Sequence, residues 1–158
     1  MMSSSIVELT IYKPEHLESM NKFSLPNEQI QFTALPTDIL EVTEGQHRIV
    51  ILSHGQPVGF FILHATDRVK EYTDNKHALL LTALSINHSE QGKGYAKMGM
   101  QRLKYFVNQT FPNYNEIVLA VNHKNLAAQK LYEKVGYIDT GRRKIGSIGE
   151  QYIYSYPI

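Results

Sequence analysis

Cysteine is the most informative absence from this chain of 158 residues. A chain without thiols holds no disulfide, no thiolate-bound zinc and no cysteine nucleophile, and it suits the reducing cytoplasm. Long apolar runs are missing too, since the longest, such as residues 58–63 and 78–81, are far too short to cross a bilayer. The short polar start, residues 1–5, lacks the features of a signal peptide. We therefore expect a cytoplasmic protein that does not enter a membrane.

An excess of one charge is also lacking, because 16 basic and 15 acidic residues leave a formal net charge of +1. This balance gives no sign of nucleic-acid binding, and the spacing of the seven histidines suggests no metal site. What the chain does contain is 42% hydrophobic residues, which is typical of a folded globular protein. Its length predicts one domain over residues 1–158, and we expect a monomer or a homodimer.

The apolar pattern predicts alternating strands and helices. Strands are expected at residues 6–12, 48–53, 58–64, 78–86, 116–121 and 151–156. Helices are expected from residue 14, briefly within 24–40, over 96–107 and over 122–135, with a turn at 54–57 and a loop at 65–77. Including a strand between the last helix and the last strand, the order is β-α-α-β-β-β-α-β-α-β-β. This order predicts an α/β (α+β) fold with a mixed sheet and helices on its faces.

A glycine-rich turn joins the apolar strand at 78–86 to the helix that follows it. The turn reads Gln91-Gly92-Lys93-Gly94-Tyr95-Ala96. Two glycines let successive backbone N–H groups point into one concavity, and the first turn of the helix adds its own free N–H groups and positive dipole. Lys93 and Lys97 add charge at the rim. An ordinary tight turn would look similar, but the strand before it and the helix after it favour a phosphate site.

Other phosphate-binding loops fit this turn less well. A Walker loop ends in Gly-Lys-Ser/Thr, which is not present here, and a dinucleotide fingerprint has a third glycine where this chain has Lys97. Instead, Gln91-x-x-Gly94-x-Ala96 resembles the Gln/Arg-x-x-Gly-x-Gly/Ala signature of the Gcn5-related N-acetyltransferase (GNAT) superfamily. The segment from Asn125 to Tyr137, with its Leu131-Tyr132 pair, looks like the second motif of that superfamily.

The resemblance implies a fold, a cofactor and a set of roles. The fold has a central mixed sheet of six to seven strands, splayed between the fourth and fifth and flanked by about four helices; its motif core here is residues 78–137. The co-substrate is acetyl-CoA, whose pyrophosphate is bound by the amides of Gln91–Ala96. The strand backbone at Leu84 and Ile86 pairs with the pantetheine arm, and the Leu84 N–H stabilises the thioester oxygen. Asn125 positions the coenzyme, and Tyr132 protonates the leaving thiolate, unless it only packs in the core.

One departure from the family pattern leaves two functions open. Some members carry a catalytic glutamate where this chain has Leu80. A base would then come from His77, His88 or a chain of waters. The implied activity is N-acetyl transfer from acetyl-CoA to a primary amine by direct attack on the thioester. The alternative is a non-catalytic domain that binds or senses acyl-CoA.

The acceptor is less constrained by the sequence than the cofactor. Small cationic amines, including polyamines, compete with protein amines. The segment between the first two predicted strands includes the acidic residues Glu28, Asp38, Glu41 and Glu44. These acids favour a cationic acceptor, although acids on a helix surface are usually only solvated.

Overall fold

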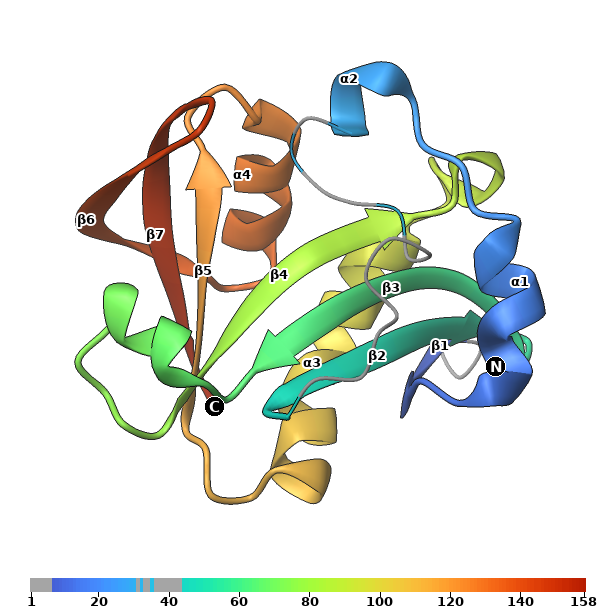
Figure 1. Ribbon diagram of the computed structural model, residues 1–158, viewed down its shortest axis with the longest axis horizontal. Helices are drawn as coiled ribbons and strands as arrows, with labels where there is room; N and C mark the ends of the chain where they lie inside the picture. The colour runs from blue at the N-terminus through green and yellow to red at the C-terminus, as the bar shows by residue number, and fades with distance from the viewer. Residues whose placement is uncertain (1–6, 31, 33–34, 36–43) are drawn as a thin grey trace.

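The computed structural model describes residues 7–30, 32, 35 and 44–158 (Figure 1). In this described part, seven strands form one sheet in the order β1-β2-β3-β4-β5-β7-β6, in which β4 and β5 run parallel and all other neighbours antiparallel. The strands are β1 (Val7–Ile11), β2 (Gln46–Ser53), β3 (Gln56–His64), β4 (Ala78–Ile86), β5 (Glu116–Asn122), β6 (Ile138–Gly146) and β7 (Gly149–Pro157). The predicted mixed sheet is confirmed.

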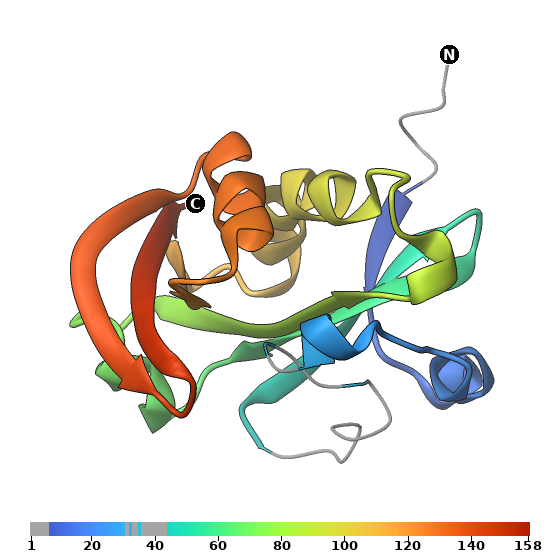
Figure 2. The ribbon, with the colours of Figure 1, turned by 90° about the horizontal axis from the view of Figure 1, so that it is seen from above.

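Helices cover both faces of this sheet (Figure 2). The two longer ones, α3 and α4, lie on one face, and the short α1 and α2 lie on the other. The described helices are α1 (Leu17–Asn21), α2 (Asn27–Ile30), α3 (Tyr95–Thr110) and α4 (Leu126–Lys134), with 3-10 turns at Pro14–His16, Asp67–Glu71 and His88–Glu90. None of the described helices is both long enough and apolar enough to span a membrane.

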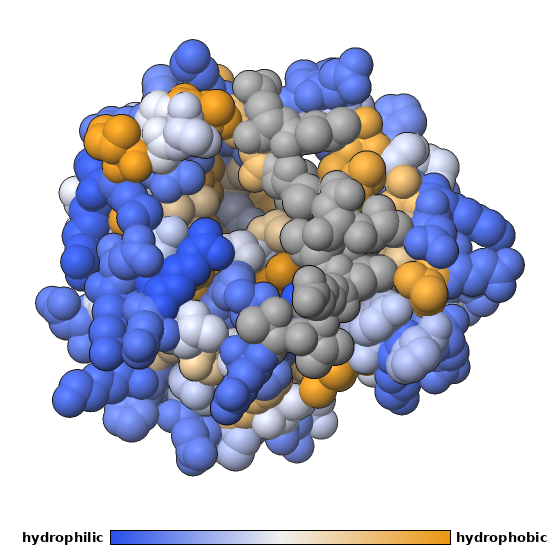
Figure 3. All heavy atoms as spheres, in the orientation of Figure 1, coloured by the Kyte–Doolittle hydropathy of each residue, from blue (hydrophilic) through white to orange (hydrophobic). Residues whose placement is uncertain are grey.

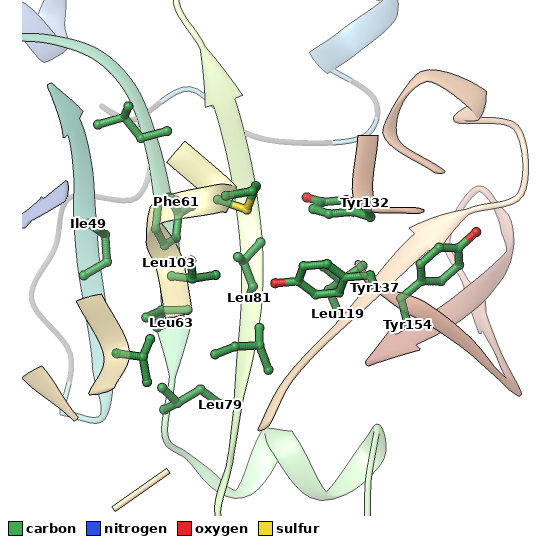
Figure 4. Close-up of a cluster of buried hydrophobic side chains, with 14 of the residues drawn as sticks. Ile49, Phe61, Leu63, Leu79, Leu81, Leu103, Leu119, Tyr132, Tyr137 and Tyr154 are labelled. Atoms are coloured by element: carbon green, nitrogen blue, oxygen red, sulfur yellow. The ribbon is translucent and has the colours of Figure 1, made fainter. Parts of the chain in front are cut away.

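The largest hydrophobic cluster lies between the sheet and the helices α3 and α4. The predicted apolar stripe of α3 is confirmed, since Met100, Leu103 and Val107 are buried there. Tyr154 of β7 belongs to the same cluster, and Figure 4 shows Leu103 and Tyr154 with side chains of β2 to β5. A second group of buried residues, around Phe60 on β3, lies on the opposite face with α1. The sheet is therefore covered on both sides, as a central parallel pair requires.

Strands β4 and β5 are neighbours for only part of their length. Their pairing runs from Ala78 with Glu116 to Leu80 with Val118, after which the two strands diverge (Figure 1). Beyond Leu80, β4 keeps β3 as its partner, and β5 keeps β7. The predicted splay between the fourth and fifth strands is thus confirmed, and it leaves one edge of β4 unpaired beside a gap in the sheet.

Three predicted boundaries differ from the structure. The turn at 54–57 is shorter, because His54 and Gly55, both with positive φ, reverse the chain by themselves and Gln56 already pairs in β3. The loop at 65–77 contains a 3-10 turn capped by Thr66. The predicted start of the helix at residue 122 was wrong, because Asn122 still pairs in β5 and the helix begins only at Leu126.

Candidate active site

A cavity of about 950 Å³ opens where β4 and β5 diverge. The face onto which it opens is hollowed near its centre (Figure 3). The cavity walls come from β4, the glycine-rich turn, the start of α3, β5, α4, α2 and the β6–β7 turn. Among the predicted coenzyme-binding and catalytic residues and their charged neighbour Lys97, those lining it are Leu84, Ile86, Gln91, Gly92, Gly94, Tyr95, Ala96, Lys97, Asn125 and Tyr132. Leu84 and Tyr132, which are 48 positions apart in the sequence, therefore meet at one site.

The glycine-rich turn has the conformation that an anion-binding loop needs. Gly92 and Gly94 both lie in the left-handed region, with φ of 80° and 82°, and Gly94 is the N-cap residue directly before α3. A side chain at Gly92 would meet nothing within 4 Å, and one at Gly94 would meet only the end of Met98. Among the described residues, no side chain caps the free N–H groups at the start of α3. The turn therefore offers uncapped N–H groups at the cavity wall.

Gln91 fixes this turn to the strand before it. Its Nε2 donates to the carbonyl oxygen of Ile86 at 2.9 Å and to Oε1 of Gln29 on α2 at 2.9 Å, and Gln29 donates back at 3.2 Å. The amide of Gln91 thus joins β4, the turn and α2. In this structure its side chain holds the shape of the cavity wall.

The unpaired edge of β4 carries the backbone groups of Leu84 and Ile86. The N–H of Asn87 donates across to Val58 of β3 at 3.0 Å. Because backbone groups of successive strand residues point to alternate edges, those of Ile86 and Leu84 point to the other edge, where β5 has left the sheet. The Gln91 bond to the Ile86 carbonyl agrees with this orientation. Leu84 is thus left with backbone groups at the cavity.

Tyr132 places a buried phenol against the cavity. Its side chain is 6% exposed, and its ring centroid lies 5.2 Å from that of Tyr137. Figure 4 shows both hydroxyl groups directed toward β4. Burial raises the pKa of Tyr132, so the phenol keeps its proton at neutral and moderately alkaline pH.

The other predicted polar residues have distinct places. Asn125 is the N-cap of α4, where its Oδ1 accepts from the N–H of Ala128 at 3.2 Å, so it stabilises the helix start as well as lining the cavity. Lys93 is absent from the described cavity lining, and its Nζ lies 3.3 Å from Oε1 of Glu90. The lysines among the described lining residues are Lys97 and Lys124.

The candidate bases are not at the cavity. His77 and His88 are exposed, and neither is among the described residues that line it. Leu80, at the glutamate position, is 1% exposed and packs with Val118 and Ile153. Among the described residues, no group of three or more His, Cys, Asp or Glu could hold a metal ion.

The acidic residues predicted near the acceptor divide into three cases. Glu28 lines the cavity from α2, whereas Glu44 does not. Asp38 and Glu41 lie outside the described residues.

Several residues that line the cavity were not predicted from the sequence. Gln29 and Phe32 come from the segment around α2, and Ser147, Ile148 and Gln151 from the β6–β7 turn. The turn reaches the cavity because β7 pairs with the whole length of β5, from Glu116 with Pro157 to Asn122 with Gln151. That pairing joins segments that are distant in the sequence, and residues 147–151 contain no local motif that predicts it.

The buried side chain of His64 should make the stability of the protein depend on pH. Burial, followed by the charges of Arg68 and Arg48, lowers the pKa of His64 from 6.5 to about 4. In the unfolded chain the pKa of His64 has its ordinary value of 6.5, so as the pH falls the unfolded chain binds the proton before the folded protein does. Stability is therefore full above pH 6.5 and declines as the pH falls toward 4, by up to about 3 kcal/mol from this group.

We expect His64→Gln to flatten this decline, as measured by urea unfolding at a series of pH values. The exposed His88 provides the control, and His88→Gln should keep the decline of the wild type. An unchanged pH dependence in His64→Gln would contradict the assignment.

Comparisons with known proteins agree with this geometry. The sequence model of the acetyltransferase (GNAT) family matches residues 13–137. The uncharacterized N-acetyltransferase YbbJ of Bacillus subtilis (strain 168) is 47% identical over 151 residues, which cover 93% of this chain and 94% of that protein.

Two solved structures share the fold. Aminoglycoside acetyltransferase AAC(6')-Ib, in complex with coenzyme A and kanamycin, has a TM-score of 0.74 at 18% identity, with 96% of this chain and 94% of that chain covered. The spermidine/spermine N-acetyltransferase SpeG of Vibrio cholerae has a TM-score of 0.66 at 18% identity, with 98% and 94% covered.

Proposed function

The chain belongs to the acetyltransferase (GNAT) family and is an acetyl-CoA-dependent N-acetyltransferase; we propose that its acceptor is a primary amine on a small cationic molecule, such as a polyamine. The observation that carries the proposal is the cavity at the splay of β4 and β5. It joins a left-handed glycine turn, an unpaired strand edge and a buried phenol. The amine attacks the thioester directly.

The residues of the cavity fit acetyl-CoA in their chemistry. The open positions at Gly92 and Gly94 let a pyrophosphate approach the N–H groups at the start of α3. In this proposal the amides of Gln91–Ala96 hold the pyrophosphate, with Lys97 adding charge. The edge of β4 at Leu84 and Ile86 pairs with the amides of the pantetheine arm, in the way that an added strand would. Asn125 positions the coenzyme from the start of α4.

Two groups of this chain then act on the reaction. Acetyl-CoA supplies an acetyl group activated as a thioester. The N–H of Leu84 donates to the thioester oxygen as negative charge develops there. The hydroxyl of Tyr132 gives its proton to the departing sulfur, and the proton that the attacking nitrogen loses passes through water to restore the phenol. Burial raises the pKa of Tyr132, and the same apolar surroundings also make a bare thiolate unfavourable, so the proton moves as the carbon–sulfur bond breaks.

The proposed acceptor enters from the face of the sheet that carries α2. That helix lies opposite α3 and α4 (Figure 2), and Glu28 and Gln29 line the cavity from it. A carboxylate at this wall favours a cationic molecule over a neutral one. A protein amine is the competing acceptor, and a panel of both kinds in a coenzyme-release assay distinguishes them. If CoA binds and no amine is acetylated, the acyl-CoA-sensing alternative gains support.

Thermal unfolding tests the cofactor. Acetyl-CoA at about 100 times its Kd should stabilise the native state by ~2.7 kcal/mol, which corresponds to a rise in Tm of roughly 5–10 °C for a chain of this size. NADH and ATP at the same concentration should leave Tm almost unchanged. A shift with NADH or ATP but none with acetyl-CoA would overturn the assignment of the site.

A further inference from the structure

Strand β4 contains a bulge at the cavity. On β3, Phe60 and Ile62 are two residues apart, but their partners on β4, Ser85 and Thr82, are three apart. The extra residue is accommodated around Ala83, which has a φ of 60°, a left-handed value uncommon for any residue except glycine. In a regular strand, positions three apart point to opposite faces.

The bulge brings two hydroxyl groups to one face of β4. Phe60 and Ile62 belong to the same buried cluster, on the face that carries α1. Because directly paired residues share a face, Thr82 and Ser85 both lie on that face, one on each side of Ala83. Both also line the cavity. This is the face from which we propose that the acceptor enters.

Each of the two hydroxyl groups has an unusual environment. Thr82 Oγ1 lies 2.6 Å from Nε2 of His64, which is 3% exposed, so a buried ring fixes its orientation. Ser85 is 5% exposed, and its Oγ is buried with no hydrogen-bond partner among the described residues. A buried hydroxyl without a partner destabilises a folded protein, so its presence at a cavity wall indicates a ligand that supplies the partner.

We propose that Thr82 and Ser85 bind the amino group of the acceptor and orient it toward the thioester. This inference rests on the proposed function, since it assigns the acceptor side of the same cavity. The two hydroxyl oxygens accept hydrogen bonds from the nitrogen, and His64 acts as a positioning residue that holds Thr82. The Leu84 N–H follows the bulge directly, so one distortion of β4 places both the amine and the thioester oxygen.

Kinetic measurements on Thr82→Val and Ser85→Ala test the proposal. The probe is whichever of spermidine, kanamycin and a lysine-containing peptide the wild type acetylates fastest. Each variant should raise the KM for that amine roughly five- to tenfold, as the loss of one hydrogen bond implies, with the KM for acetyl-CoA unchanged. Thr82→Ser, which keeps the hydroxyl, should remain close to wild type. Thr10→Val, on β1 and outside the described cavity lining, is the matched control and should change neither constant.

Two readouts that need no turnover complete the test. Calorimetric binding of the same amine to the complex of the protein with CoA should weaken in both variants. The Tm of Ser85→Ala without ligands should equal or exceed that of the wild type, because no hydrogen bond is lost. The inference would be overturned if both variants had the wild-type KM and the wild-type binding affinity for the amine. A lowered Tm in Ser85→Ala would overturn it as well. A wild type that acetylates none of the amines would instead refute the proposed acceptor, and the inference with it.

Discussion

Replacing Tyr132 with phenylalanine should lower kcat by roughly one to three orders of magnitude, in line with typical contributions of acid catalysis. The substitution keeps the ring, which packs 5.2 Å from that of Tyr137, and removes only the hydroxyl. CoA affinity and Tm should therefore stay close to wild type. Steady-state kinetics with a saturating amine, together with CoA titration, measure the effect.

The controls separate catalysis from packing. Tyr132→Ala removes a side chain that is 6% exposed, and it should lower Tm as well, because it leaves a cavity in the core. Because the pKa of Tyr132 is raised, the wild type should show no loss of activity from this group up to about pH 10. Normal turnover in Tyr132→Phe would mean that another group, or water, protonates the thiolate.

Replacing Gly94 with valine should weaken CoA binding tenfold or more. Gly94 has a φ of 82°, and β-branched residues rarely adopt such values. The turn must either hold strain or move its N–H groups, and each outcome disturbs the pyrophosphate site. Isothermal titration with CoA measures the change.

Gly55 offers a matched control for that variant. It has a φ of 78° and open space around it, and it lies in the turn between β2 and β3, outside the described cavity lining. Gly55→Val should therefore cause comparable backbone strain and leave CoA affinity unchanged. Equal CoA affinity in Gly94→Val and the wild type would remove the turn from the binding site.

The parts of the site that the sequence predicted are local in the chain. The turn at Gly92 and Gly94 was recognisable because a strand, two glycines and a helix follow one another, and the structure has both glycines in the left-handed region. Tyr132 was recognisable because its segment resembles the second motif of the superfamily, and it is buried against the cavity. The order of the elements is as predicted, and so is the splay between the fourth and fifth strands that the family resemblance implied.

The parts of the site that were not predicted from the sequence depend on contacts between segments that are distant in the chain. Nothing in the sequence marks Ala83 as left-handed, because alanine carries no turn signal, and only the pairing with β3 reveals the bulge. The same holds for Ser85, whose missing hydrogen-bond partner is a property of its surroundings. Gln151 reaches the cavity only through the pairing of β7 with β5.

A crystal structure of the protein with bound CoA would place the coenzyme relative to the residues proposed to bind it. We predict the pyrophosphate on the N–H groups between Gln91 and Ala96, and the pantetheine arm along the unpaired edge of β4 at Leu84 and Ile86. The sulfur should lie within hydrogen-bonding distance of the Tyr132 hydroxyl. Density for CoA elsewhere on the molecule, or in this cavity with its sulfur remote from both Leu84 and Tyr132, would contradict the account.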